Sequence, residues 1–417
     1  MSRTPALVAF LVLGGLLVVV IALTTPWSPL GAGAPHVPVD PARDFTPEQV
    51  AREVAFHRAL RPAAYASLFL GLAVAGALGL TRTGARLVER VPGPWPVKAA
   101  GGALALALVP TLLTLPLSAR AEVVLRRYDL STRTWGGWLG DQARSALVGG
   151  VILVVATTGL VALARKAPAT WWAWGGVGAA VLVALVSYVY PVAVEPLFND
   201  FRPLAQEPLR SRLLDLAERD GIEVDDVLVA DASRRTTALN AYVSGYGSTR
   251  RIVVYDTLLA KGSDDEVALV VAHELGHVKN DDVRNGTLVG ALGAAAAVAG
   301  LFLLLTSPRV LARAGADGAG DPRVLGLVVF AIAATGFLTS PVQSLVSRRV
   351  EARADVHSID LTGDLDAFVE SEKTLAVTNL SDLDPHPLAY AWFASHPTSP
   401  ERLALARARA LQREERP

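Results

Sequence analysis

Seven long stretches of the chain are apolar and free of charged residues, and they restrict its fold more than any other feature. They lie between Arg3 and Asp40, Arg61 and Arg82, Lys98 and Arg120, Arg144 and Arg165, Lys166 and Glu195, Arg284 and Arg309, and Arg323 and Arg348. Roughly 20 residues at about 1.5 Å per residue cross about 30 Å of hydrocarbon. A mean hydropathy of +0.38 and 52% hydrophobic residues are also too apolar for an ordinary soluble enzyme. The sequence therefore predicts seven membrane-spanning helices.

The first stretch has a second interpretation. Its apolar core, Leu7 to Leu23, precedes the small residues Gly31 to Ala34, a pattern that also occurs at signal-peptide cleavage sites. Because this core is longer than the apolar region of a usual signal peptide, we favour a retained span.

Charge and cysteine content exclude several classes of function. The 39 basic and 39 acidic residues balance, so bulk charge gives no reason to expect nucleic-acid binding. The sequence contains no cysteine, which excludes disulfides, thiolate metal sites and a cysteine nucleophile. Any bound metal must be held by His, Glu or Asp.

A His-Glu-x-x-His motif runs from His273 to His277. Residues four apart share a helix face, so the two histidines can bind one metal ion, while Glu274 can accept a proton from water. Ser263 and Glu266 form a capping-box pattern before the motif, which predicts a helix start there. The alternative, two merely packed histidines in a buried helix, is the less favoured interpretation.

The polar segment that contains this motif has mixed secondary-structure signals. We expect a helix at Glu207 to Asp220, a strand at Val224 to Ala230, and a hairpin formed by Ala238 to Ser244 and Arg251 to Tyr255. The predicted fold is mainly α: a polytopic seven-helix membrane bundle with a small, inserted α/β zincin-like catalytic unit. The predicted parts are 1–195 (spans one to five), 196–283 (catalytic segment), 284–346 (spans six and seven) and 347–417 (C-terminal tail).

Two histidines leave zinc short of the three protein ligands usual in a catalytic site. After the seventh stretch, Glu351 and Asp355 lie four residues apart in a helix-like run and can share a face. Glu351 is a candidate ligand, and Asp355 can accept a hydrogen bond from a ligating histidine. From spacing alone, a solvated charged face is the simpler interpretation.

The chain resembles the type-I CAAX prenyl endopeptidase family of seven-span zinc metalloproteases. The resemblance rests on motifs in the same order along the chain: Glu195 to Asn199, Ser233 to Tyr242, Arg251 to Leu258, His273 to His277, Ser347 to Asp355, and Ser395 to Leu403. It implies that Glu351 is the third ligand of one Zn²⁺ per chain and that Asn240 and His396 lie in the substrate cleft. It also implies that the spans enclose a membrane chamber.

These observations predict an integral-membrane zinc metalloendopeptidase whose partners are peptide or protein substrates and membrane lipid, with no nucleic acid. Glu274 is the expected general base, and His396 and Asn240 are expected to donate hydrogen bonds to the substrate. Two alternatives stay open: a membrane quality-control protease of the heat-shock type, and a transporter or scaffold with a relic zinc site. The sequence does not define the oligomeric state.

Basic residues indicate the orientation. They are modestly more frequent beside the catalytic segment and its connected loops than on the opposite side, which favours an active site facing the cytoplasm. A composition rich in Ala, Gly, Val and Arg, with one Met, is typical of a high-GC bacterial genome and places the chain in a bacterial cell membrane.

Overall fold

The structure is a computed structural model that describes residues 3–414. Within these residues, seven helices are long and apolar enough to span a membrane. They are α1 (Thr4–Thr24), α3 (Pro47–Leu80), α5 (Trp95–Arg127), α6 (Trp135–Lys166), α7 (Trp171–Ala193), α11 (Asp282–Leu305) and α13 (Leu325–Thr362). Each contains one of the predicted apolar stretches, so the prediction of a polytopic seven-helix bundle is confirmed.

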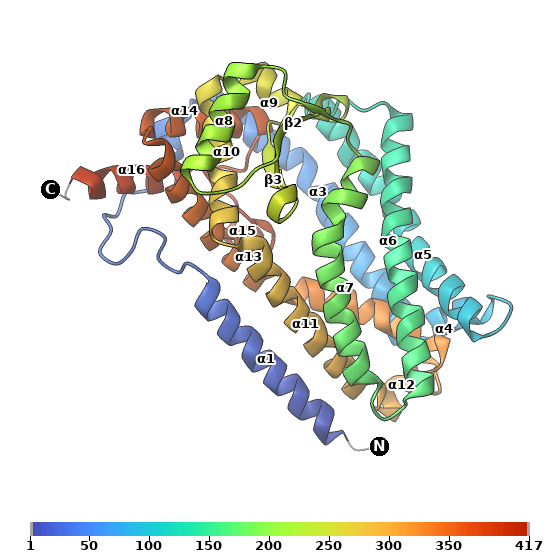
Figure 1. Cartoon of the computed structure of the whole chain (residues 1–417). Helices are drawn as coiled ribbons and strands as arrows, with labels where there is room; N and C mark the ends of the chain where they lie inside the picture. Colours follow the sequence, from blue (N-terminus) through green and yellow to red (C-terminus); the bar gives the residue numbers. More distant parts are fainter. Residues whose placement is uncertain (1–2, 415–417) are drawn as a thin grey trace.

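Six of these helices form a closed ring. Each helix contacts the next one: α3 packs against α5, α5 against α6, α6 against α7, and α7 against α11. Helix α13 contacts both α11 and α3 and closes the ring. Helix α1 lies outside the ring along α11 (Figure 1). No more than 28% of any apolar window is buried, so most apolar residues of the spans are at least partly exposed, as a lipid environment allows.

Several spans extend beyond their apolar stretches. Helix α3 begins at a capping box between Thr46 and Gln49, and its 34 residues correspond to about 51 Å, more than the hydrocarbon thickness. Helix α13 continues past Arg348 because no stop signal intervenes, and it ends at Gly363, which adopts a left-handed conformation with φ of 73°. The predicted boundary at 346/347 therefore lies inside a helix, as does the one at 283/284.

The segment between α7 and α11 contains a four-stranded sheet in the order β1-β2-β4-β3. The strands are β1 (Phe201–Pro203), β2 (Asp226–Ala230), β3 (Ala241–Ser244) and β4 (Arg251–Tyr255). Strands β2 and β4 are parallel, and the other pairs are antiparallel, which includes the predicted β3–β4 hairpin. Helices α8 (Glu207–Arg219), α9 (Asp256–Lys261) and α10 (Asp264–Lys279) complete this unit, as the predicted small α/β insertion requires.

Strand β3 begins at Ala241, three residues later than predicted. The carbonyl of Ala238 accepts a hydrogen bond from the Thr257 hydroxyl, and the amide of Asn379 binds both the N–H and the C=O of Leu239. These backbone groups are therefore withdrawn from the strand ladder. Residues before Ala241 lead into the strand without belonging to it.

Helices after α13 close over the catalytic unit. They are α14 (Leu365–Asn379), α15 (Pro387–Phe393) and α16 (Ser399–Glu414), and the catalytic unit and these helices lie at one end of the bundle (Figure 1). Helix α10 packs between the sheet, α13 and α14. The remaining short elements are α2 (Pro41–Asp44), α4 (Arg82–Glu89), α12 (Pro308–Ala314), η1 (Glu195–Leu197), η2 (Ala232–Arg234), η3 (Gly247–Thr249) and η4 (Pro322–Val324).

Candidate active site

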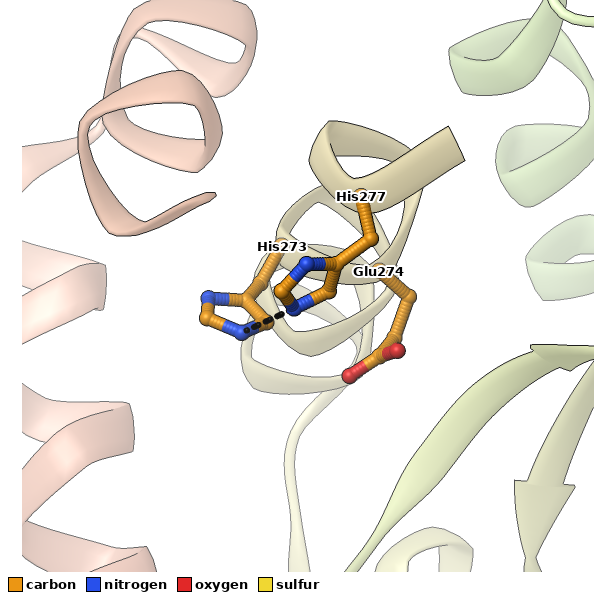
Figure 2. Close-up of side chains that lie close together, drawn as sticks. All are labelled: His273, Glu274 and His277. Atoms are coloured by element: carbon orange, nitrogen blue, oxygen red, sulfur yellow. Dashed lines mark hydrogen bonds between the residues drawn. The ribbon is translucent and has the colours of Figure 1, made fainter. Parts of the chain in front are cut away.

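Helix α10 presents the two motif histidines on one face. Its N-terminus is fixed by the predicted capping box between Ser263 and Glu266. One turn apart, His273 and His277 bring their Nε2 atoms to 3.2 Å from each other, as Figure 2 shows. Both rings therefore direct the same type of nitrogen to a common point.

Helix α13 brings Glu351 to this point from 78 residues away in the sequence. Its Oε2 lies 3.2 Å from Nε2 of His273, and its Oε1 lies 3.7 Å from Nε2 of His277. The long packing contact between α10 and α13 sets these distances. It also places the catalytic segment and the C-terminal helices at the same end of the bundle (Figure 1).

Each histidine has a carboxylate on its outer nitrogen. Nδ1 of His273 lies 2.9 Å from Oδ1 of Asp355, the contact that the shared face of Glu351 and Asp355 predicts. Nδ1 of His277 lies 2.9 Å from Oδ2 of Asp282, a partner that the sequence prediction missed. Asp282 begins α11 directly after Asp281, whose left-handed conformation (φ 55°) turns the chain back toward the motif.

These contacts test whether the residues fit a metal ion. Because each Nδ1 faces a carboxylate, it carries the ring proton, and Nε2 presents a lone pair. With neutral rings, the two Nε2 lone pairs and the Glu351 carboxylate converge on one point, an arrangement that a cation stabilises. Tetrahedral zinc with ligands at about 2.0–2.2 Å separates neighbouring ligands by about 3.3–3.6 Å. The observed 3.2–3.7 Å is close to this range, so the donor set fits zinc.

Glu274 follows His273 on the same helix and lies close to both histidines. Its carboxylate lies beside the rings in Figure 2, and its ligand oxygen is within 4.8 Å of the histidine nitrogens. Burial raises the pKa of the Glu274 carboxyl above its usual range. A partly buried carboxylate with a raised pKa is a stronger base than a solvated one, as a proton acceptor requires.

The other two predicted site residues line a cavity of about 800 Å³ that also contains His273 and Glu274. Nε2 of His396 lies 3.4 Å from Oε2 of Glu351. Asn240 directly precedes β3, and its side chain is exposed to this cavity. The cavity is thus lined by Asn240, His273, Glu274 and His396, while His277, Glu351 and Asp355 reach the same cluster through their contacts with His273.

A largely buried arginine, Arg402, supports Asp355. Nε of Arg402 lies 2.9 Å from Oδ2 of Asp355, and its two terminal nitrogens reach the other Asp355 oxygen and Glu372, each at 2.5 Å. The Asp355 side chain is fully buried, so its charge depends on Arg402 and His273 for compensation. The sequence prediction included Arg402 only within a motif and gave it no role.

A helix-borne pair of histidines completed by a distant glutamate, at the end of a membrane bundle, is the construction of a membrane metallopeptidase. Comparisons with known proteins agree. Residues 203–410 match the model of peptidase family M48, and residues 97–200 match the model described as CAAX prenyl protease N-terminal, five membrane helices. The chain belongs to peptidase family M48. It is a membrane metalloprotease, and the family implies a metal ion that is generally zinc.

Individual relatives support this assignment. The chain is 33% identical over 308 residues to the uncharacterized metalloprotease YhfN of Bacillus subtilis, covering 73% of this chain and 72% of the relative. It is 29% identical over 318 residues to CAAX prenyl protease 1 of Saccharomyces cerevisiae, covering 70% and 68%. The crystal structure of Ste24p from S. mikatae shares its fold, with a TM-score of 0.76 over 97% of this chain and 99% of that chain, at 23% identity. The family match argues against a non-catalytic transporter or scaffold.

Proposed function

We propose that this chain is a zinc-dependent endopeptidase that cleaves extended or C-terminal segments of its substrates. His273, His277 and Glu351 would hold one zinc ion per chain. The convergence of their three lone-pair donors at 3.2–3.7 Å is the observation that carries this proposal. A zinc ion held there supplies Lewis-acid chemistry, polarising the carbonyl of the scissile peptide bond and making water more acidic.

Glu274 moves the proton. Its carboxylate faces the cavity beside the histidine rings and can accept a proton from the attacking water. It then delivers that proton to the amine nitrogen as the peptide C–N bond breaks. The same carboxyl group therefore acts first as base and then as acid.

His396 and Asn240 stabilise the developing negative charge from the cavity wall. His396 lies on the Glu351 side of the metal ligands, with Nε2 3.4 Å from Oε2 of that residue. Asn240 is exposed to the same cavity. Both side chains can donate a hydrogen bond to the carbonyl oxygen of the substrate as it becomes an oxyanion.

Strand β3 offers a backbone edge for the substrate. It is the last strand of the sheet, and the Tyr255 N–H donates to the Asn240 carbonyl at 3.0 Å. In an antiparallel pair, hydrogen-bonding residues alternate, so the backbone groups of Ala241 and Val243 point away from β4; Ala241 is buried, and Val243 is partly exposed at this edge. An extended peptide can pair there as an added strand, which excludes a folded domain as substrate.

A proline substitution in β3 tests this binding mode. Val243→Pro removes one N–H from the open edge, where proline is tolerated, while Val243→Ala keeps the backbone and shortens the side chain. With an unstructured peptide, Val243→Pro should raise KM about fivefold, the effect of a hydrogen bond worth about 1 kcal/mol. Equal KM values for the two variants would remove β3 from substrate binding. The same assay with and without a prenylated cysteine on the peptide measures dependence on the lipid.

The location that we propose is a bacterial cell membrane, with the active site facing the cytoplasm and lipid around the spans. The excess of basic residues near the catalytic side supports this orientation. Reporter fusions after Gly262 and at the C-terminus should both report the cytoplasm. A periplasmic report from both fusions would reverse the orientation.

A further inference from the structure

The segment that carries His396 belongs to no helix or strand. Residues 394–398 connect α15 to α16, and the His396 side chain is 62% exposed. Its Nδ1 contacts only the neighbouring Ser395 hydroxyl, at 2.9 Å. Packing around the ring is therefore too sparse to fix its place beside Glu351, and the ends of the segment must do so.

The N-terminal end of the segment is held by Arg348. We propose that Arg348 is the positioning residue that fixes His396 over the metal-ligand cluster. One of its terminal nitrogens donates to the carbonyls of Tyr390 and Ala394, at 2.9 and 2.6 Å. The guanidinium also lies 4.2 Å from the centre of the Tyr390 ring. The last turn of α15 and the first residue of the segment are thus tied to one side chain.

The C-terminal end is held by Glu401, which accepts the Thr398 N–H at 2.7 Å. Glu401 also accepts a hydrogen bond from the Tyr390 hydroxyl. Tyr390 therefore joins the two ends: its ring and carbonyl contact Arg348, and its hydroxyl contacts Glu401. The segment of His396 is closed at its base by these three side chains.

Arg348 lies on α13, the helix that also carries Glu351, and this shared origin links it to the metal ligands. Arg348 and Glu351 are three residues apart on one continuous helix, so they lie one above the other on the same face. A rigid helix therefore fixes both the third metal ligand and the support of His396. Displacing a catalytic group by about 1 Å can cost about 100-fold in rate, which gives Arg348 an effect on kcat without contact with substrate.

This inference rests on the role proposed for His396, and a double-mutant cycle tests the two separately. The four proteins are the full-length wild type, Arg348→Ala, His396→Ala and the double variant, each assayed for kcat, KM and zinc content. Arg348→Ala should lower kcat about 10–100-fold with zinc content and KM little changed. In the His396→Ala background the same substitution should change kcat by no more than about twofold. Arg348→Lys keeps a donor for both carbonyls and should recover most of the rate.

A control variant and the possible outcomes of the cycle test the positioning role of Arg348. Arg349→Ala removes a neighbouring exposed arginine and should leave kcat unchanged. An Arg348→Ala loss that is equal in both backgrounds, or absent in the first, overturns the positioning role and leaves that of His396 intact. An unchanged kcat in His396→Ala overturns both. If Arg348→Ala melts below the assay temperature, Arg348→Gln takes its place in the cycle under the same criteria.

Discussion

Within residues 3–414, two groups of histidine and carboxylate side chains could hold a metal ion, one formed by His273 and His277 with Glu274 and Glu351, and the other by Glu53, His57 and Asp382. The ligand atoms of His273, Glu274 and His277, like those of Glu53, His57 and Asp382, lie within 4.8 Å of one another, and the Glu351 oxygens lie 3.2 and 3.7 Å from the two histidine nitrogens. By composition alone, either group could hold a metal. The first lies between α10 and α13, and the second joins α3 to the loop between α14 and α15.

The partners of the ring nitrogens distinguish the two groups. In the first, Asp355 and Asp282 occupy both Nδ1 atoms, so both Nε2 atoms present lone pairs inward. In the second, Nε2 of His57 faces Glu53 at 3.4 Å and also donates to the carbonyl of Leu380 at 2.9 Å. The nitrogen that a metal would need therefore carries a proton.

Charge separates the two groups further. Arg61 pairs with Asp382 in the second group, so one of its two carboxylates is already neutralised. In the first group, Arg402 contacts Asp355 and Arg353 contacts Asp282, and the Glu351 carboxylate faces the histidines. The comparison teaches that the hydrogen bonds around the ligands decide which cluster can bind a metal.

The largest difference between the groups should follow from loss of Glu351. Glu351→Ala removes one of three ligands and should abolish both zinc binding and peptidase activity. Glu370→Ala, an exposed glutamate on α14, is the matched control and should retain both. Stoichiometric zinc in purified Glu351→Ala, measured by mass spectrometry, would require another ligand in its place.

Glu274→Gln should separate chemistry from metal binding. The amide keeps the shape of the side chain but cannot accept the proton of water, so activity should fall about 10²–10⁴-fold with one zinc per chain retained. Glu218→Gln, on the exposed face of α8, is the control. Near-normal turnover by Glu274→Gln would assign the base to another residue.

Asp282→Ala tests the partner of His277 that the structure adds. Loss of this carboxylate should weaken zinc affinity about 10–100-fold, because the ring loses the group that fixes its tautomer. Competition with a chelator of known affinity measures this. Asp281→Asn, which changes the neighbouring exposed carboxylate, should leave affinity unaltered. Equal zinc affinities of Asp282→Ala and Asp281→Asn would show that Asp282 does not fix the tautomer of His277.

Substitution in the second group, Glu53, His57 and Asp382, should change stability slightly and leave zinc content unchanged. His57→Ala loses the hydrogen bond to the Leu380 carbonyl and should lower the free energy of unfolding by about 1 kcal/mol without loss of zinc. Arg58→Ala, an exposed neighbour on α3, provides the baseline for thermal melting in detergent. A drop in zinc content in His57→Ala would contradict the distinction drawn between the groups.

Residues close in sequence were predictable, and contacts between distant segments were not. Apolar length marks the spans, and spacing pairs His273 with His277, because both depend on local periodicity. Glu351 needed the family resemblance, since spacing alone favoured a solvated face. Asp282 was present only as a charge near the motif, and no local pattern indicates that an αL residue turns it toward His277.

The same limit explains the corrected strand and the arginine. The start of β3 depends on Asn379, which lies 140 residues beyond Leu239. The role of Arg402 depends on α16 packing against α13, 47 residues from Asp355. Such contacts are fixed by tertiary packing, which hydrophobic periodicity does not encode pair by pair.

The most direct test of the distinction between the two groups is a count of zinc ions per chain. The measurement compares the wild type with a triple variant of the second group, Glu53→Gln, His57→Ala and Asp382→Asn, by mass spectrometry after exhaustive dialysis. One zinc per chain in both proteins is the predicted result. Two ions in the wild type, or none in the triple variant, would contradict the assignment of the metal to His273, His277 and Glu351.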